Sequence, residues 1–81
     1  MFNLYNPDEK LIARIAPGEK NFPDALDYDE EQVILDFGMI SRNDKTLTLR
    51  VYKSEERAAE VCDMIVNAFR SGKSEFILPK E

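Results

Sequence analysis

The fold is decided by residues 46–70, which read TLTLRVYKSEERAAEVCDMIVNAFR. Up to Tyr52, apolar residues alternate with polar ones, which is the two-residue period of a half-buried strand. Beyond Ser54 the apolar residues recur every three or four positions, at 58, 61, 62, 65, 68 and 69, which predicts one apolar stripe along a helix. Ser54 is suited to cap this helix and Gly72 to end it. The stretch therefore predicts a strand followed by an amphipathic helix.

Other segments have the alternation and the flanking turn residues of strands. They are residues 2–5 and 11–15, which form a hairpin, residues 32–40, which pair antiparallel with 46–52, and the short segment 75–78. Residues 16–31 lack a clear period and are interpreted as a long loop. The order β-β-(loop)-β-β-α-β predicts a single α+β domain over residues 1–81. Its expected architecture is an antiparallel sheet of four to five strands with one amphipathic helix packed on one face.

The composition is acidic, with 16 Asp and Glu residues, 11 Lys and Arg residues, no His and a formal charge of −5. This charge opposes non-specific attraction to a phosphate backbone, so we expect no general nucleic-acid binding. Apolar runs are only a few residues long, too short for a membrane span or a signal peptide. We therefore expect a cytoplasmic protein with no membrane partner.

Much of the acidic excess lies in segment 24–31, which contains Asp24, Asp27, Asp29, Glu30 and Glu31. Like charges this close favour a solvated, extended connection. A calcium loop would also need a glycine at its turn, which the segment lacks. The segment can alternatively act on a basic partner, as a mimic of a phosphate backbone. The residues leave open whether it is functional or only a solvated loop.

The sequence offers no constellation for catalysis. Without histidine there is no Ser-His or Cys-His pair and no ordinary general base near neutral pH. Cys62 falls on the apolar stripe of the helix, where it is expected to pack in the core. The glycines at 18, 38 and 72 are too far apart for a phosphate loop. We therefore expect no enzymatic activity, no catalytic residues, no metal site and no cofactor.

One helix of about 25 Å covers only one face of such a sheet. Apolar residues are nevertheless expected on the other face, namely Ile12, Ile34, Ile40 and Tyr52. A contiguous apolar patch usually marks an interface, so these residues predict a homo-oligomer, a dimer or higher. The alternative is that the long loop folds Phe22, Leu26 and Tyr28 over this face.

A second set of residues is suited to an anionic ligand: Arg14, Arg42, Lys45, Arg50 and Tyr52. Arginine forms bidentate bonds to phosphate, and a nearby aromatic ring can stack on a base. The alternative is that these are ordinary surface charges, some of them paired with Asp36 or Glu75.

Residues 51–58, VYKSEERA, are followed by Val61, Met64, Ile65 and Asn67-Ala68-Phe69. This pattern resembles small phage and prophage proteins of Gram-positive bacteria, and residues 76–81, FILPKE, resemble their closing segment. The best-described members are Thoeris anti-defence proteins, oligomeric sponges that sequester cyclic nucleotide signals without cleaving them. The resemblance implies a non-enzymatic binding protein that holds a cyclic nucleotide in the host cytoplasm. The alternative function is an acidic protein-protein interaction module or inhibitor of a host protein.

Overall fold

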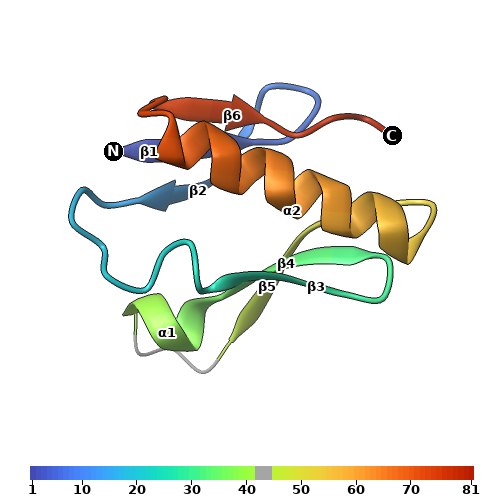
Figure 1. Cartoon of the computed structure of the whole chain (residues 1–81), viewed down its shortest axis with the longest axis horizontal. Helices are drawn as coiled ribbons and strands as arrows, with labels where there is room; N and C mark the ends of the chain where they lie inside the picture. The colour runs from blue at the N-terminus through green and yellow to red at the C-terminus, as the bar shows by residue number, and fades with distance from the viewer. Residues whose placement is uncertain (42–44) are drawn as a thin grey trace.

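The chain forms two three-stranded sheets and one long helix that contacts both (Figure 1). The computed structural model describes residues 1–41 and 45–81. The elements are β1 (Phe2–Tyr5), β2 (Leu11–Ile15), β3 (Leu26–Asp29), β4 (Gln32–Asp36), α1 (Phe37–Ser41), β5 (Thr46–Val51), α2 (Glu55–Arg70) and β6 (Glu75–Ile77). Sheet A has the strand order β2-β1-β6, and sheet B has the order β3-β4-β5. The α+β class is confirmed, but the expected single sheet is instead two small sheets.

Sheet A joins the two ends of the sequence. The β1–β2 hairpin is confirmed, and Asn6 Oδ1 holds its turn by accepting hydrogen bonds from the amides of Asp8 and Lys10 at 2.9 and 3.0 Å. β6 lies parallel to β1, and the Leu78 amide extends this pairing by donating to the Tyr5 carbonyl at 2.9 Å. Parallel strands need a long crossover. Here the crossover includes sheet B and α2, so no local pattern predicts this pairing.

Sheet B is an antiparallel meander. β4 and β5 pair in the predicted arrangement, with Leu35 opposite Leu47. β3 lies in the segment expected to be a loop and pairs with β4 through a turn at Glu30 and Glu31. The acidic residues at 27 and 29 occupy alternate positions of β3 and are exposed, so they do not prevent the strand from forming.

β4 is shorter than the strand predicted over residues 32–40. It ends at Asp36, and the helix α1 follows where the sequence alternation predicts continued strand. The Gly38 amide donates to Asp36 Oδ1 at 2.9 Å. Such local bonds from an aspartate offer the backbone an alternative to the ladder of a sheet and favour the start of a helical turn.

The prediction for α2 is confirmed at both ends. Ser54 Oγ accepts a hydrogen bond from the Arg57 amide at 3.2 Å, as an N-cap does. Just beyond the helix, Gly72 has a φ of +80°, a conformation that glycine adopts without strain. The predicted stripe is buried at Ala58, Val61, Cys62, Ile65 and Ala68.

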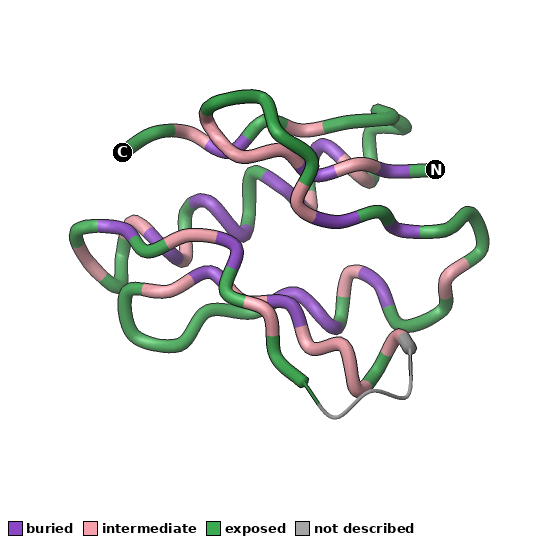
Figure 2. The backbone as a smooth tube through the Cα atoms, turned by 180° about the vertical axis from the view of Figure 1, so that it is seen from behind, coloured by how far each residue is buried: buried purple, intermediate pink, exposed green. Residues whose placement is uncertain are grey.

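One core fills the space between the sheets and beneath α2 (Figure 2). Its most deeply buried side chains come from all three parts: Leu4 and Ile15 of sheet A, Val33 and Leu35 of sheet B, Val61 and Ile65 of α2, and Leu78. Phe2, Phe22 and Phe69 add an aromatic cluster with ring centroids 4.8–5.9 Å apart. The inner face of each sheet is thus covered by the chain itself, and the outer faces belong to different sheets.

Bulges in two edge strands shift which residues face the core. β5 has one extra residue relative to β4, Leu49, and β2 has one relative to β1, Ile12. An extra residue moves the following side chains to the opposite face. Val51 is therefore 58% exposed and Tyr52 only 4% exposed, and Leu11 is 43% exposed. The sequence alternation predicts the reverse for Val51 and Tyr52, and that prediction is wrong.

Candidate functional site

The last four residues form a strap, residues 78–81, which is held by side chains of β5, α2 and the connection between them. Leu78 is buried and anchors the strap in the core. Three side chains donate five hydrogen bonds to three successive carbonyl oxygens: Tyr52 Oη to Pro79 at 2.8 Å, Arg50 Nε and Nη2 to Lys80 at 3.2 and 3.0 Å, and Arg57 Nε and Nη2 to Glu81 at 3.0 and 2.8 Å. The strap is thus held against β5 and the start of α2 by these hydrogen bonds.

The structure brings together only part of the predicted anion-binding set. Arg50 and Tyr52 meet at the strap, but Arg14 is exposed on β2 in the other sheet. Lys45 is exposed just before β5, and Arg42 lies outside the described residues. Burial raises the pKa of Tyr52, opposed by the neighbouring charges of Arg50 and Arg57. Because the Tyr52 ring is buried, it is not available to stack on a base.

Four basic residues lie around the strap, and only Arg50 among them belongs to the predicted anion-binding set. Arg50, Lys53, Arg57 and Lys80 form what we call the basic corner. Beside it lies a groove of about 380 Å³, lined by Val51, Tyr52, Lys53, Lys80 and Glu81. Within residues 1–41 and 45–81 the one ion pair joins Arg57 to Glu60 at 3.5 Å. Most charges of the basic corner therefore have no carboxylate partner among the described residues.

The residues predicted to form an oligomer interface do not share one face. Ile12 lies in sheet A, Ile34 in sheet B and Ile40 in α1. All three are half-buried, and Ile12 and Ile40 pack against the core. Tyr52 is buried beneath the strap. Of the residues in the alternative prediction, Phe22 and Leu26 are buried in the core, whereas Tyr28 is 38% exposed.

Tyr28 lies in a second groove, which we call the acidic groove, between β3 and the first turn of α2. The groove has a volume of about 390 Å³ and is lined by Tyr28, Ser54, Glu55, Glu56 and Ala59. Glu55 and Glu56 are exposed. Their carboxylates lie in the first turn of α2, where the positive end of the helix dipole stabilises negative charge. The groove therefore combines a partly exposed aromatic ring with two carboxylates.

The β3–β4 hairpin extends the negative charge around the acidic groove. Asp27, Asp29, Glu30 and Glu31 are all exposed, and none forms an ion pair within the described residues. Glu30 has a φ of +55°, a region that non-glycine residues seldom adopt.

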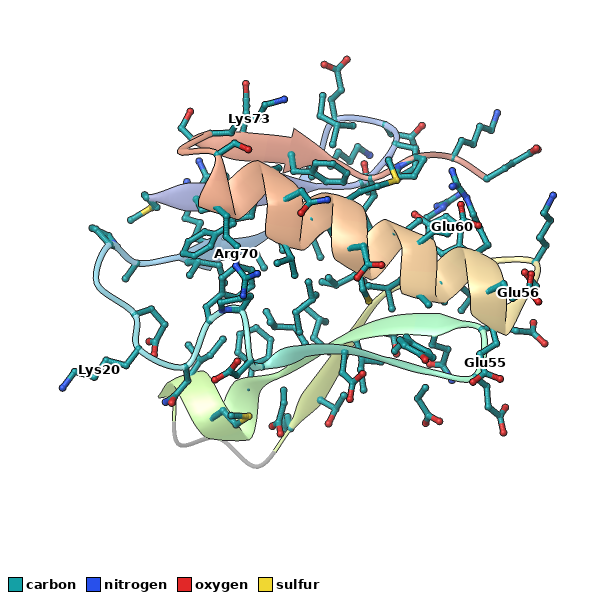
Figure 3. All side chains as sticks on the ribbon, viewed as in Figure 1. Lys20, Glu55, Glu56, Glu60, Arg70 and Lys73 are labelled. Atoms are coloured by element: carbon teal, nitrogen blue, oxygen red, sulfur yellow. The ribbon has the colours of Figure 1, made fainter. Side chains whose placement is uncertain are left out.

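Charge is also separated along α2 (Figure 3). Glu55 and Glu56 lie at the end of the helix next to the hairpin, while Lys20, Arg70 and Lys73 lie toward the opposite end. The carboxylates of Glu55 and Glu56 therefore lie at the end of α2 where the acidic groove is found, and the basic corner lies beside the same end of the helix.

The acidic segment is recognisable in the sequence, but the groove that Tyr28 forms with the first turn of α2 is not. The signal for Tyr28 was the alternation in LDYD, residues 26–29, which places Leu26 and Tyr28 on one face of a strand. That Tyr28 lines one groove with Glu55 and Glu56 depends on the packing of α2 against β3, which has no local signal.

Cys62 has the properties expected of a core thiol. It is buried, its Sγ donates to the Asp27 carbonyl at 3.3 Å, and burial raises its pKa to about 12, with Asp27 and Asp63 adding to the shift. Among the described residues, no three acidic, cysteine or histidine side chains are grouped closely enough to hold a metal ion. No helix of the described residues is both long and apolar enough to cross a membrane.

These observations are the basis for assigning a function, since the comparisons add none. The chain matches no protein-family model, no curated protein and no solved structure.

Proposed function

We propose that this chain is a non-catalytic binding protein whose acidic groove receives a basic segment of a partner protein. The observation that supports this most directly is the partly exposed ring of Tyr28 beside the carboxylates of Glu55 and Glu56 in one groove. The proposal develops the reading of the sequence as an acidic interaction module and assigns it to particular residues.

The chemistry of the groove suits arginine or lysine. A guanidinium or ammonium group over a tyrosine ring is stabilised by about 0.5–1 kcal/mol at exposed sites. The carboxylates of Glu55 and Glu56 line the same groove and can accept charge-assisted hydrogen bonds from the cation. The ring thus supplies a contact surface and the carboxylates supply orientation.

The hairpin contributes attraction over longer distances. Asp27, Asp29, Glu30 and Glu31 add four exposed carboxylates to the hairpin that carries Tyr28, with Asp27 and Asp29 on the opposite face of β3 from the Tyr28 ring. A concentrated field of one sign raises the association rate of an oppositely charged partner, and salt screens this field over about 10 Å at 0.1 M. Binding is therefore expected to weaken as salt is raised.

The test is fluorescence anisotropy with a labelled peptide of alternating arginine and glycine. We expect binding to the wild-type protein and none to the same peptide with glutamine in place of arginine. Glu55→Gln with Glu56→Gln should weaken binding about two- to thirtyfold, since exposed charge pairs contribute about 0.2–1 kcal/mol each. Tyr28→Ala should weaken it about two- to fivefold through loss of the ring.

The matched control is Asp8→Asn with Glu9→Gln, which neutralises two adjacent exposed carboxylates in the β1–β2 turn of sheet A. It changes the net charge equally and should leave the affinity within about twofold. Equal losses in the two double variants would mean that only net charge matters, and would contradict a site at the groove.

A second function, sequestration of a small phosphate-bearing ligand, has one favourable observation. Arg50, Lys53, Arg57 and Lys80 converge beside a groove in a chain whose net charge is −5. One observation opposes this second function: the guanidinium groups of Arg50 and Arg57 already donate hydrogen bonds to carbonyl oxygens of the strap.

A panel of cyclic di- and trinucleotides and cyclic ADP-ribose isomers tests this function by the melting temperature, because a ligand of the folded state raises it. A rise that is lost in Lys53→Gln but kept in Lys20→Gln would support it. No rise at millimolar ligand would exclude it.

A further inference from the structure

Open sheet edges invite pairing with other chains, and three of the four edge strands in the described part of this chain are protected. β2 and β5 each contain a bulge, at Ile12 and Leu49. β3 carries the charged residues Asp27 and Asp29 and packs against α2, whose Cys62 donates to its backbone. Bulges, charges and covering elements are the usual means by which proteins prevent edge pairing.

β6 is protected least, because it contains no bulge and its one charged residue is Glu75. It pairs with β1 without a bulge, and Ile77 is 44% exposed. The Ser74 carbonyl and the Leu78 amide bond to β1. Because the peptide groups of a strand alternate between its two sides, the N–H and C=O groups of Glu75 and Ile77 point away from β1. The outer side of β6 therefore presents donors and acceptors that have no partner among the described residues.

An apolar row leads to this open edge across the outer face of sheet A. Tyr5 is paired with Leu11 of β2 on one side and with Ile77 of β6 on the other. Leu11 and Ile77 are exposed, and Tyr5 is half-buried. A strand added beside β6 would extend this row.

We propose that β6 pairs antiparallel with β6 of a second copy, so that the two copies of sheet A form one continuous sheet. A two-fold axis at Phe76 sets Glu75 opposite Ile77 of the other copy, and the two residues exchange backbone hydrogen bonds. The shifted register that sets Glu75 opposite Glu75 is disfavoured by like charges. The opposite shift sets Glu75 against Pro79, which has no N–H to donate.

The charge distribution favours a second copy as the occupant of this edge. Residues 71–81 contain Lys73, Lys80, Glu75 and Glu81 and have no net charge, so the whole charge of −5 lies in residues 1–70. Two acidic molecules therefore repel each other least when they meet at this segment. A strand paired with its own copy about a two-fold axis also satisfies both edges at once.

Sedimentation equilibrium over a concentration series up to the millimolar range tests the proposal. We expect the wild-type mass to rise from 9.4 kDa toward twice that value. Ile77→Pro removes an outward N–H while keeping the bonds to β1, and should stay monomeric. The matched control is Arg14→Pro on β2: Arg14 is opposite Asn3, whose amide bonds to β6, so the Arg14 N–H also points outward. It should dimerise as the wild type does.

Amide hydrogen exchange in the wild-type protein keeps the proposal testable if a proline variant fails to fold. Exchange at Glu75 and Ile77 should slow as the concentration rises, while exchange at Arg14 stays constant. A wild-type mass of 9.4 kDa at every concentration would overturn the proposal. So would equal dimerisation of the two proline variants, or a dimer with no slowing at Glu75 and Ile77.

Discussion

Glu30 stands at a turn position that suits glycine, in the middle of the acidic hairpin. Its φ of +55° brings Cβ close to the backbone, which costs a non-glycine residue about 1–2 kcal/mol.

Glu30→Gly should therefore stabilise the fold by up to about 1 kcal/mol, because glycine adopts this φ without strain. Urea unfolding monitored by circular dichroism measures the change. The control is Glu31→Gly in the same turn, where φ is not positive and glycine should destabilise by about 0.5 kcal/mol through the entropy of the unfolded chain. Equal effects of the two variants would contradict this account of the turn.

Cys62 predicts a dependence of stability on pH. Its pKa rises from 9.0 to about 12 on folding, chiefly because the thiol is buried. Between these values the folded state holds a proton that the unfolded state has released, so the free energy of unfolding falls as pH rises. The stabilisation is complete below pH 9 and is lost progressively toward pH 12.

The measurement is urea unfolding at pH 7 to 11 for the wild type and Cys62→Ala. The variant should be less stable at pH 7 because it leaves a small cavity, and it should lose less stability above pH 9 than the wild type. Part of the decline remains, since burial also raises the pKa of Tyr52. Parallel declines in the two proteins would show that the thiol does not titrate as described.

At the scale of elements, the position of the strap depends on a few side-chain hydrogen bonds. Tyr52→Phe removes the hydroxyl that donates to the Pro79 carbonyl and should destabilise the fold by about 1 kcal/mol. Thermal unfolding measures the loss. Tyr5→Phe serves as control, because the Tyr5 hydroxyl has no hydrogen-bond partner within the described residues, and it should be nearly neutral. If both variants are neutral, the strap contributes nothing through this bond.

The elements that sequence patterns predicted are those whose signal is local. Ser54 and Gly72 mark the ends of α2 by their own chemistry, and the alternation in Val33 and Leu35 marks β4. The bulge at Leu49 has no such signal, because strict alternation fits the sequence equally well until the strand is paired. The position of Tyr52 was predicted incorrectly for this reason alone.

At the scale of the whole molecule, the division into two sheets depends on contacts distant in sequence. β6 pairs with β1 from the other end of the chain, and the acidic groove forms only when α2 packs on β3. Patterns within ten or twenty residues contain no information on either contact. The acidic segment was therefore recognised from the sequence, while the groove beside the first turn of α2 required the structure.

The central claim is that the acidic groove, at Tyr28, Glu55 and Glu56, receives a basic segment of a partner protein. The most direct test is a titration of isotope-labelled protein with the alternating arginine-glycine peptide, followed by amide chemical shifts. The claim predicts saturable shifts at these three residues and along the β3–β4 hairpin, with little change in sheet A. Shifts centred elsewhere, or none at millimolar peptide, would contradict it.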